Sequence, residues 1–106
     1  MVFVETTLFT KLLGDYLADD EYRQLQTHLI AHPDAGAVIR GSGGVRKVRW
    51  GSGGKGKSGG VRVIYYWAVS DDQIFFLTLY GKAEKDDLSA ADLKRVVALL
   101  TELTDD

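Results

Sequence analysis

Apolar residues recur at helical spacing in two early stretches of the chain. A short β-branched and aromatic run at residues 2–5 (VFVE) comes first and predicts a strand. The leucine stripe that follows predicts a helix over residues 7–17, and a second stripe predicts another over residues 19–32. Pro33 ends the second helix, because proline disfavours helical backbone at the residue before it.

The apolar period then changes from that of helices to that of strands. Three β-prone runs follow at residues 45–50, 61–67 and 74–80, and the polar residues 71–73 predict a tight hairpin turn between the last two. Ser89 opens a final amphipathic helix. The order β-α-α-β-β-β-α predicts an α+β fold, with a small antiparallel sheet and the helices packed on one face.

Length and composition narrow the class of protein. The 106 residues are 45% hydrophobic and 26% charged, which is typical of one globular domain over residues 1–106. No apolar run approaches the roughly 18 residues of a membrane span. The chain has no cysteine and no secretory signal, so we expect a cytosolic protein without disulfides, zinc–thiolate sites or a membrane partner.

Positive charge is concentrated in the middle of a chain whose formal net charge is −2. Between Asp34 and Asp71 there is no acidic residue, whereas seven basic residues lie there. They are Arg40, Arg46, Lys47, Arg49, Lys55, Lys57 and Arg62. A basic block in an otherwise acidic chain indicates a polyanionic ligand.

The stretch GSGGKGKS at residues 51–58 satisfies the phosphate-binding loop pattern of nucleotide hydrolases. Such a loop must run into a helix, whose N-terminus binds the phosphates, but here two glycines and a β-prone strand follow. Nucleotide hydrolysis is therefore disfavoured. The glycines still allow Lys55 and Lys57 to approach a phosphodiester backbone closely.

Strand alternation brings several of these basic residues together. Lys47 and Arg49 share one face of their strand, and the predicted hairpin places Arg62 and Lys82 at the same sheet edge. A phosphate-binding groove is expected from Lys47, Arg49, Lys55, Lys57, Arg62, Tyr80 and Lys82. Tyr66 or Tyr80 could stack on a base, and Arg46 is a further RNA-binding candidate.

Histidine chemistry contributes little to this picture. His28 and His32 stand at i and i+4 of one helix, but no third metal ligand is apparent beside them. We therefore expect no metal and no other cofactor. Neither histidine is placed near the basic groove, so proton transfer there would fall to other groups.

The segments GSGGVRKVRW, GKGKSGGVRVIYYW and IFFLTLYGKAEKDDLSAADLK resemble toxins of the RelE/ParE superfamily, and more closely its HigB-like branch, over residues 3–94. The resemblance implies a cytosolic bacterial endoribonuclease that cuts mRNA in the decoding site of the translating ribosome without a metal. It also implies neutralisation by a HigA-like antitoxin with a helix-turn-helix region. Operator DNA would then be bound only through the antitoxin.

The resemblance also implies roles for individual residues. The family's basic strand residues correspond to Lys47 and Arg49, its lysine loop to Lys55 and Lys57, its phosphate-binding arginine to Arg62, and its strand-end site to Tyr80 and Lys82. An arginine and a tyrosine of the best-known RelE pattern are replaced by Ala83 and Ser89. Tyr80 is the candidate replacement for that tyrosine, which leaves the general base open.

A mechanism without histidine follows from these residues. Arg62, which stays charged, would stabilise the transition state. Lys57 or Lys82 would act as acid or base, since neighbouring positive charges disfavour the protonated state of a lysine. Two other functions remain open: a non-catalytic RNA- or ribosome-binding module, and a ParE-like inhibitor of DNA gyrase.

Overall fold

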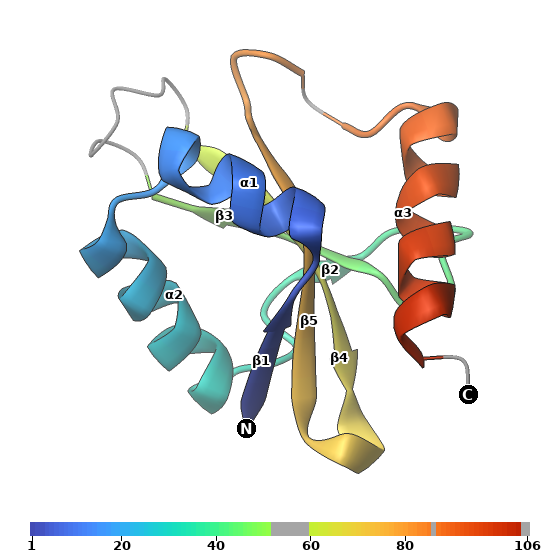
Figure 1. The fold of residues 1–106 in the computed structure, drawn as a ribbon, viewed down its shortest axis with the longest axis horizontal. Helices are drawn as coiled ribbons and strands as arrows, with labels where there is room; N and C mark the ends of the chain where they lie inside the picture. Colours follow the sequence, from blue (N-terminus) through green and yellow to red (C-terminus); the bar gives the residue numbers. More distant parts are fainter. Residues whose placement is uncertain (52–59, 86, 105–106) are drawn as a thin grey trace.

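The fold is taken from a computed structural model that describes residues 1–51, 60–85 and 87–104. Its elements appear in Figure 1. In chain order they are β1 (Val2–Glu5), α1 (Thr7–Tyr16), α2 (Asp19–Ala31), β2 (Ala37–Val38), β3 (Arg46–Trp50), β4 (Val61–Ala68), a 3-10 turn (Val69–Asp71), β5 (Gln73–Gly81) and α3 (Ala90–Thr104). The predicted helices and strands are confirmed, and the two-residue strand β2 is an addition.

The strands form one sheet in the order β1-β5-β4-β3-β2. The predicted α+β class is confirmed, but the sheet is mixed and not purely antiparallel, because β1 pairs parallel to β5. Helices α1 and α2 lie between β1 and the rest of the sheet in sequence, and a long crossover of this kind permits parallel pairing. The Thr6 hydroxyl, at the end of β1, donates to the carbonyl of Leu77 at 2.8 Å and fixes this junction.

Helices cover both faces of the sheet, which corrects the expectation that they pack on one face (Figure 1). Residues Phe9 and Leu25 of α1 and α2 pack against one face, and Val96 and Leu100 of α3 pack against the other. The reason lies in β4, where residues of both alternation classes are buried from Val61 to Tyr65. A strand that is apolar on both sides needs a cover on both sides.

An irregularity in β5 breaks the simple alternation of its side chains. The register with β4 shifts between Ile64 and Tyr65, leaving Leu77 as the extra residue of a bulge. Leu77 and Tyr80 therefore both pack on the α3 side, while Leu79 packs on the α1 side. The bulge thus decides which face Tyr80 reaches.

Two glycines meet where β3 ends and β4 begins. Gly60 has φ +79°, and a Cβ added to it would lie 2.7 Å from the carbonyl oxygen of Gly51. Its own carbonyl accepts a hydrogen bond from the backbone N–H of Lys82 at 3.2 Å. Only glycine fits this conformation without strain, and its backbone holds the start of the β5–α3 loop.

Gly60→Ala is expected to lower the free energy of unfolding by about 2 kcal/mol, since left-handed backbone costs a side-chain-bearing residue about 1–2 kcal/mol before any clash. Urea denaturation monitored by circular dichroism measures this. Gly14→Ala is the matched control: it lies in α1 with nothing within 4 Å of the new Cβ. It should stabilise the protein by about 0.5–1 kcal/mol. Equal effects of the two substitutions would contradict the assignment.

Candidate nucleic-acid interface

An open cleft of about 650 Å³ lies over one end of β3 and β4, on the α3 side of the sheet. Among the described residues, four cationic side chains line it. The described residues of the lining are Ala35, Ala37, Lys47, Val48, Arg49, Arg62, Lys82 and Asp87. Alternation along β3 and β4 and the hydrogen bond that holds Lys82 to Gly60 bring these residues together from three separate segments.

Two of the cations face each other directly across the strands. Arg49 on β3 is the Cα partner of Arg62 on β4, and Arg62 is in turn the partner of Tyr80 on β5. Like charges at directly opposite positions destabilise a sheet. A bound anion would reduce this repulsion, so the facing pair favours an anionic ligand in the cleft.

Arg62 is the most buried of the four cations, with only 4% of its surface exposed. Electrostatic interactions are stronger in such a low-dielectric position than at an exposed one. A guanidinium also remains charged and can bind two oxygens of a phosphate at once. Arg62 is thus suited to fix a phosphodiester at the floor of the cleft.

Asp87 is an acidic residue within this basic cleft. Its carboxylate accepts a hydrogen bond from Lys47 and forms an ion pair with it. That bond, with a smaller contribution from the charge of Arg62, holds the pKa of Asp87 below its ordinary value. Sequence reasoning missed Asp87, and the only signal was its place five residues after Lys82 in the loop that leaves β5.

The two tyrosines expected near the phosphates are engaged in packing, although Tyr80 is the cross-strand partner of Arg62. Tyr80 is 3% exposed and packs in the α3-side core, with the ammonium of Lys85 5.1 Å from its ring centroid. Tyr66 stacks on Phe75 with ring centroids 6.5 Å apart. Neither residue lines the cleft. A base could stack on Tyr80 only after the core beside α3 had rearranged.

Arg46 points to the other side of its strand and holds the backbone. Its guanidinium donates to the carbonyls of Gly36 at 2.7 Å and Asp34 at 3.2 Å. These bonds fix the segment that leads into β2, where Ala35 and Ala37 form one wall of the cleft. Arg46 thus shapes the cleft without lining it.

The predicted lysine loop cannot be placed, because Lys55 and Lys57 lie outside the described residues. The rings of His28 and His32 are 5.3 Å apart, and His28 lies beside Trp50. Over residues 1–51, 60–85 and 87–104, no cluster of three or more His, Cys, Asp or Glu side chains could hold a metal ion. Within the same ranges, no helix has the length and apolar character needed to cross a membrane.

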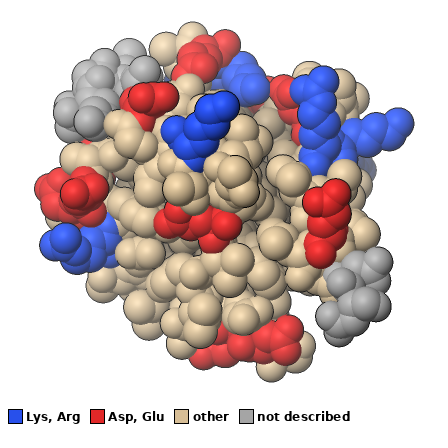
Figure 2. Space-filling model, in the orientation of Figure 1, with Lys and Arg blue, Asp and Glu red and all other residues tan. Residues whose placement is uncertain are grey.

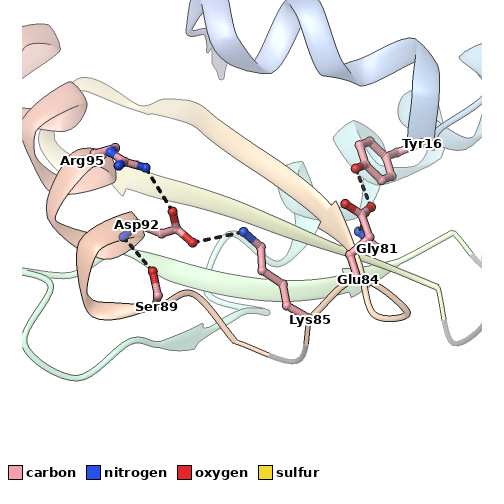
Figure 3. Close-up of polar contacts among 7 residues, drawn as sticks. All are labelled: Tyr16, Gly81, Glu84, Lys85, Ser89, Asp92 and Arg95. Atoms are coloured by element: carbon pink, nitrogen blue, oxygen red, sulfur yellow. Dashed lines mark hydrogen bonds and ion pairs between the residues drawn. The ribbon is translucent and has the colours of Figure 1, made fainter.

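Polar contacts position the loop that carries Lys82 and Asp87 (Figure 3). Upstream, the hydroxyl of Tyr16 donates to Glu84 at 2.5 Å, and the Glu84 carboxylate also accepts from the backbone N–H of Gly81 at 3.2 Å. Burial, together with Glu84, raises the pKa of Tyr16 to about 12. The tyrosine therefore stays protonated as a donor at neutral pH.

Downstream, the loop is fastened to the start of α3 (Figure 3). Asp92 accepts from Lys85 at 3.1 Å and lies 3.4 Å from Arg95, while the Ser89 hydroxyl accepts from the backbone N–H of Asp92 at 3.0 Å. Acidic and basic side chains also lie close to one another across the molecular surface drawn in Figure 2. Anchors on both sides of Asp87 thus hold the loop against the cleft.

Comparison with known proteins agrees with this architecture. A family model described as the RelE toxin of the RelE/RelB toxin-antitoxin system matches residues 30–105, which include β3, β4, β5 and the whole cleft. A solved structure of the Escherichia coli toxin RelE, a double arginine-to-alanine mutant in the free state, superposes with a TM-score of 0.59 at 18% identity. It covers 93% of this chain and 95% of that one. The chain belongs to the RelE toxin family, within the RelE/ParE superfamily.

Proposed function

We propose that the protein is a ribosome-dependent endoribonuclease that cleaves mRNA and thereby inhibits translation in the bacterial cytoplasm. Membership of the RelE toxin family implies an antitoxin partner, and we propose a HigA-like, helix-turn-helix antitoxin that also mediates any contact with operator DNA. One observation carries the proposal: Lys47, Arg49, Arg62 and Lys82 converge on a single cleft.

Convergent cations favour a phosphodiester chain over a neutral or cationic ligand. Lys47 and Arg49 lie on one strand, and Arg62 lies opposite Arg49 on the next, so the charges are spread along the cleft. An RNA backbone presents phosphates in a row and can contact several of these side chains at once. The resemblance seen in the sequence assigns phosphate-binding roles to these same positions, which supports the proposal.

Cleavage by such a cleft uses the 2′-hydroxyl of the RNA itself. The 2′-oxygen loses its proton and bonds to phosphorus, the bond from phosphorus to the 5′-oxygen breaks, and the leaving 5′-oxygen gains a proton. Arg62 would bind the phosphate as negative charge accumulates on it, which is the largest contribution a preorganised site can make. Lys57 or Lys82 would act as acid or base. A neutral lysine would accept the proton of the 2′-hydroxyl, and a charged lysine would donate a proton to the leaving 5′-oxygen.

The ribosome has a physical role in this scheme. In-line attack requires the 2′-oxygen, the phosphorus and the 5′-oxygen to be aligned, and correct orientation can account for several powers of ten in rate. The described cleft places no aromatic ring against a base, since Tyr66 and Tyr80 pack in the core. A ribosome that holds the mRNA bent would supply the alignment.

The test is a cleavage assay with mapped product ends. Purified protein, either untreated or treated with EDTA and then desalted, is mixed with mRNA in the presence and absence of translating bacterial ribosomes. We expect cuts only with ribosomes, equal for both protein samples, and ending in 2′,3′-cyclic phosphate and 5′-hydroxyl groups. Tight binding with intact mRNA would instead indicate a non-catalytic RNA- or ribosome-binding module. Intact mRNA with inhibited supercoiling would indicate a gyrase inhibitor.

A further inference from the structure

Asp87 places a negative charge where the proposed function requires a phosphate. We propose that the Asp87 carboxylate is an internal competitor for the phosphate site at Lys47, so that RNA enters the cleft only by displacing it. The inference rests on the proposed function in one respect, namely that the cleft binds the phosphate groups of RNA.

The geometry supports competition for one subsite. The side chain of Lys47 is 28% exposed and that of Asp87 is 73% exposed, and the Lys47 ammonium is bonded to the Asp87 carboxylate. A carboxylate oxygen and a phosphate oxygen accept the same hydrogen bonds from an ammonium group. The Lys47 ammonium has three N–H donors, but two anions bonded to the same nitrogen lie close together and repel each other. Binding of one anion therefore disfavours binding of the other.

A catalytic role for Asp87 as general base is less well supported. The bond to Lys47 holds the pKa of this carboxyl below its ordinary value of 3.8. General-base efficiency falls as the pKa of the base moves away from the working pH, so Asp87 would accept a proton from a 2′-hydroxyl poorly. Its charge and position suit an electrostatic role better.

Displacement is energetically accessible because the pair is exposed. Exposed ion pairs are weak, since water screens both charges. Flanking anchors return the loop to its place when the ligand leaves, through Glu84 on one side and Asp92 on the other. Asp87 would thus weaken the binding of substrate and product alike and favour release after cleavage.

The test is a double-mutant cycle on binding, which does not depend on cleavage. The dissociation constant of a 2′-O-methyl RNA oligonucleotide, which lacks the attacking hydroxyl, is measured for the wild type, Asp87→Asn, Lys47→Gln and the double variant. We expect Asp87→Asn to bind about 3- to 10-fold more tightly than the wild type. In the Lys47→Gln background the same change should have less than about a twofold effect, because the shared partner is gone.

Salt dependence gives a second readout. In the wild type, an RNA phosphate that binds Lys47 displaces the Asp87 carboxylate, and the freed carboxylate attracts a cation from solution. This uptake offsets one of the counterions that the RNA releases on binding. Asp87→Asn should therefore steepen the slope of log affinity against log salt by about 0.7. Asp71→Asn, which removes the same charge at the far end of the β4–β5 hairpin, is the control and should leave both quantities unchanged.

Two results would overturn the inference while leaving the proposed function standing. One is unchanged RNA affinity of folded Asp87→Asn, and the other is an equal gain in both Lys47 backgrounds, which would indicate a long-range charge effect only. Failure of every variant, the wild type included, to bind the oligonucleotide would instead overturn the phosphate cleft itself and the proposed function with it.

Discussion

Arg62→Ala is expected to reduce mRNA cleavage on translating ribosomes by about 100- to 1000-fold, the loss typical of removing one preorganised charge from a transition state. Arg62 is buried at 4% exposure at the floor of the cleft, opposite Arg49, where its charge is least screened. Single-turnover cleavage rates with mapped ends measure the effect.

Two further variants separate charge from geometry in this experiment. Arg62→Lys keeps the charge but loses the planar fork, so its rate should lie between those of the wild type and Arg62→Ala. Arg23→Ala makes the same truncation at an exposed position of α2 and should leave the rate unchanged. Circular dichroism checks that Arg62→Ala is folded before its rate is compared with the wild-type rate. A folded Arg62→Ala protein with the wild-type rate would contradict the assignment.

Tyr65→Phe is expected to lower the free energy of unfolding by about 3 kcal/mol, which corresponds to a fall in Tm of about 15 °C for a domain of this size. The Tyr65 ring is fully buried, and its hydroxyl accepts from the Gly36 N–H at 2.9 Å and donates to the Pro33 carbonyl at 2.8 Å. Removing the hydroxyl leaves the buried N–H of Gly36 unsatisfied and also removes the donor to the partly buried carbonyl of Pro33. Differential scanning calorimetry measures the change.

The matched control for Tyr65→Phe is Tyr22→Phe. The Tyr22 hydroxyl donates a hydrogen bond to Glu5 at 2.7 Å, in a partly buried position where water can replace it. Tyr22→Phe should lower the free energy of unfolding by about 1 kcal/mol. Similar losses for the two variants would show that the Gly36 and Pro33 contacts are not the source of the larger effect. Tyr65→Phe should also weaken RNA binding, since those contacts hold the segment that forms the cleft wall.

The local sequence pattern was sufficient to predict the helices and strands and some of the residues that line the cleft. The order of helices and strands follows from apolar spacing, and alternation alone placed Lys47 and Arg49 on one face with Arg62 beside them. These are properties of short segments, with periods of 3.6 or 2 residues. The cover on both faces could also have been read from the sequence, since Val61 to Tyr65 is apolar at both alternation classes except for Arg62.

The features that the local sequence pattern did not predict depend on contacts between segments far apart in the sequence. The parallel pairing of β1 with β5 is a tertiary choice, and no feature of residues 2–5 specifies it. The bulge at Leu77 shifts the faces of the strand by one residue, so alternation could not show that Tyr80 packs beneath α3. Asp87 reaches Lys47 across 40 positions of sequence, through a loop with no period to interpret.

The central position of β5 has a consequence for how the protein is made. β5 lies between β1 and β4, and the bond from Thr6 to Leu77 spans 71 positions of sequence. Contacts this distant form late, because a long loop must close before they contribute. During synthesis, β1 has no strand to pair with until Gln73–Gly81 have left the ribosome. A nascent chain shorter than that has no completed sheet and no cleft, so any activity of the cleft begins only after β5 has emerged.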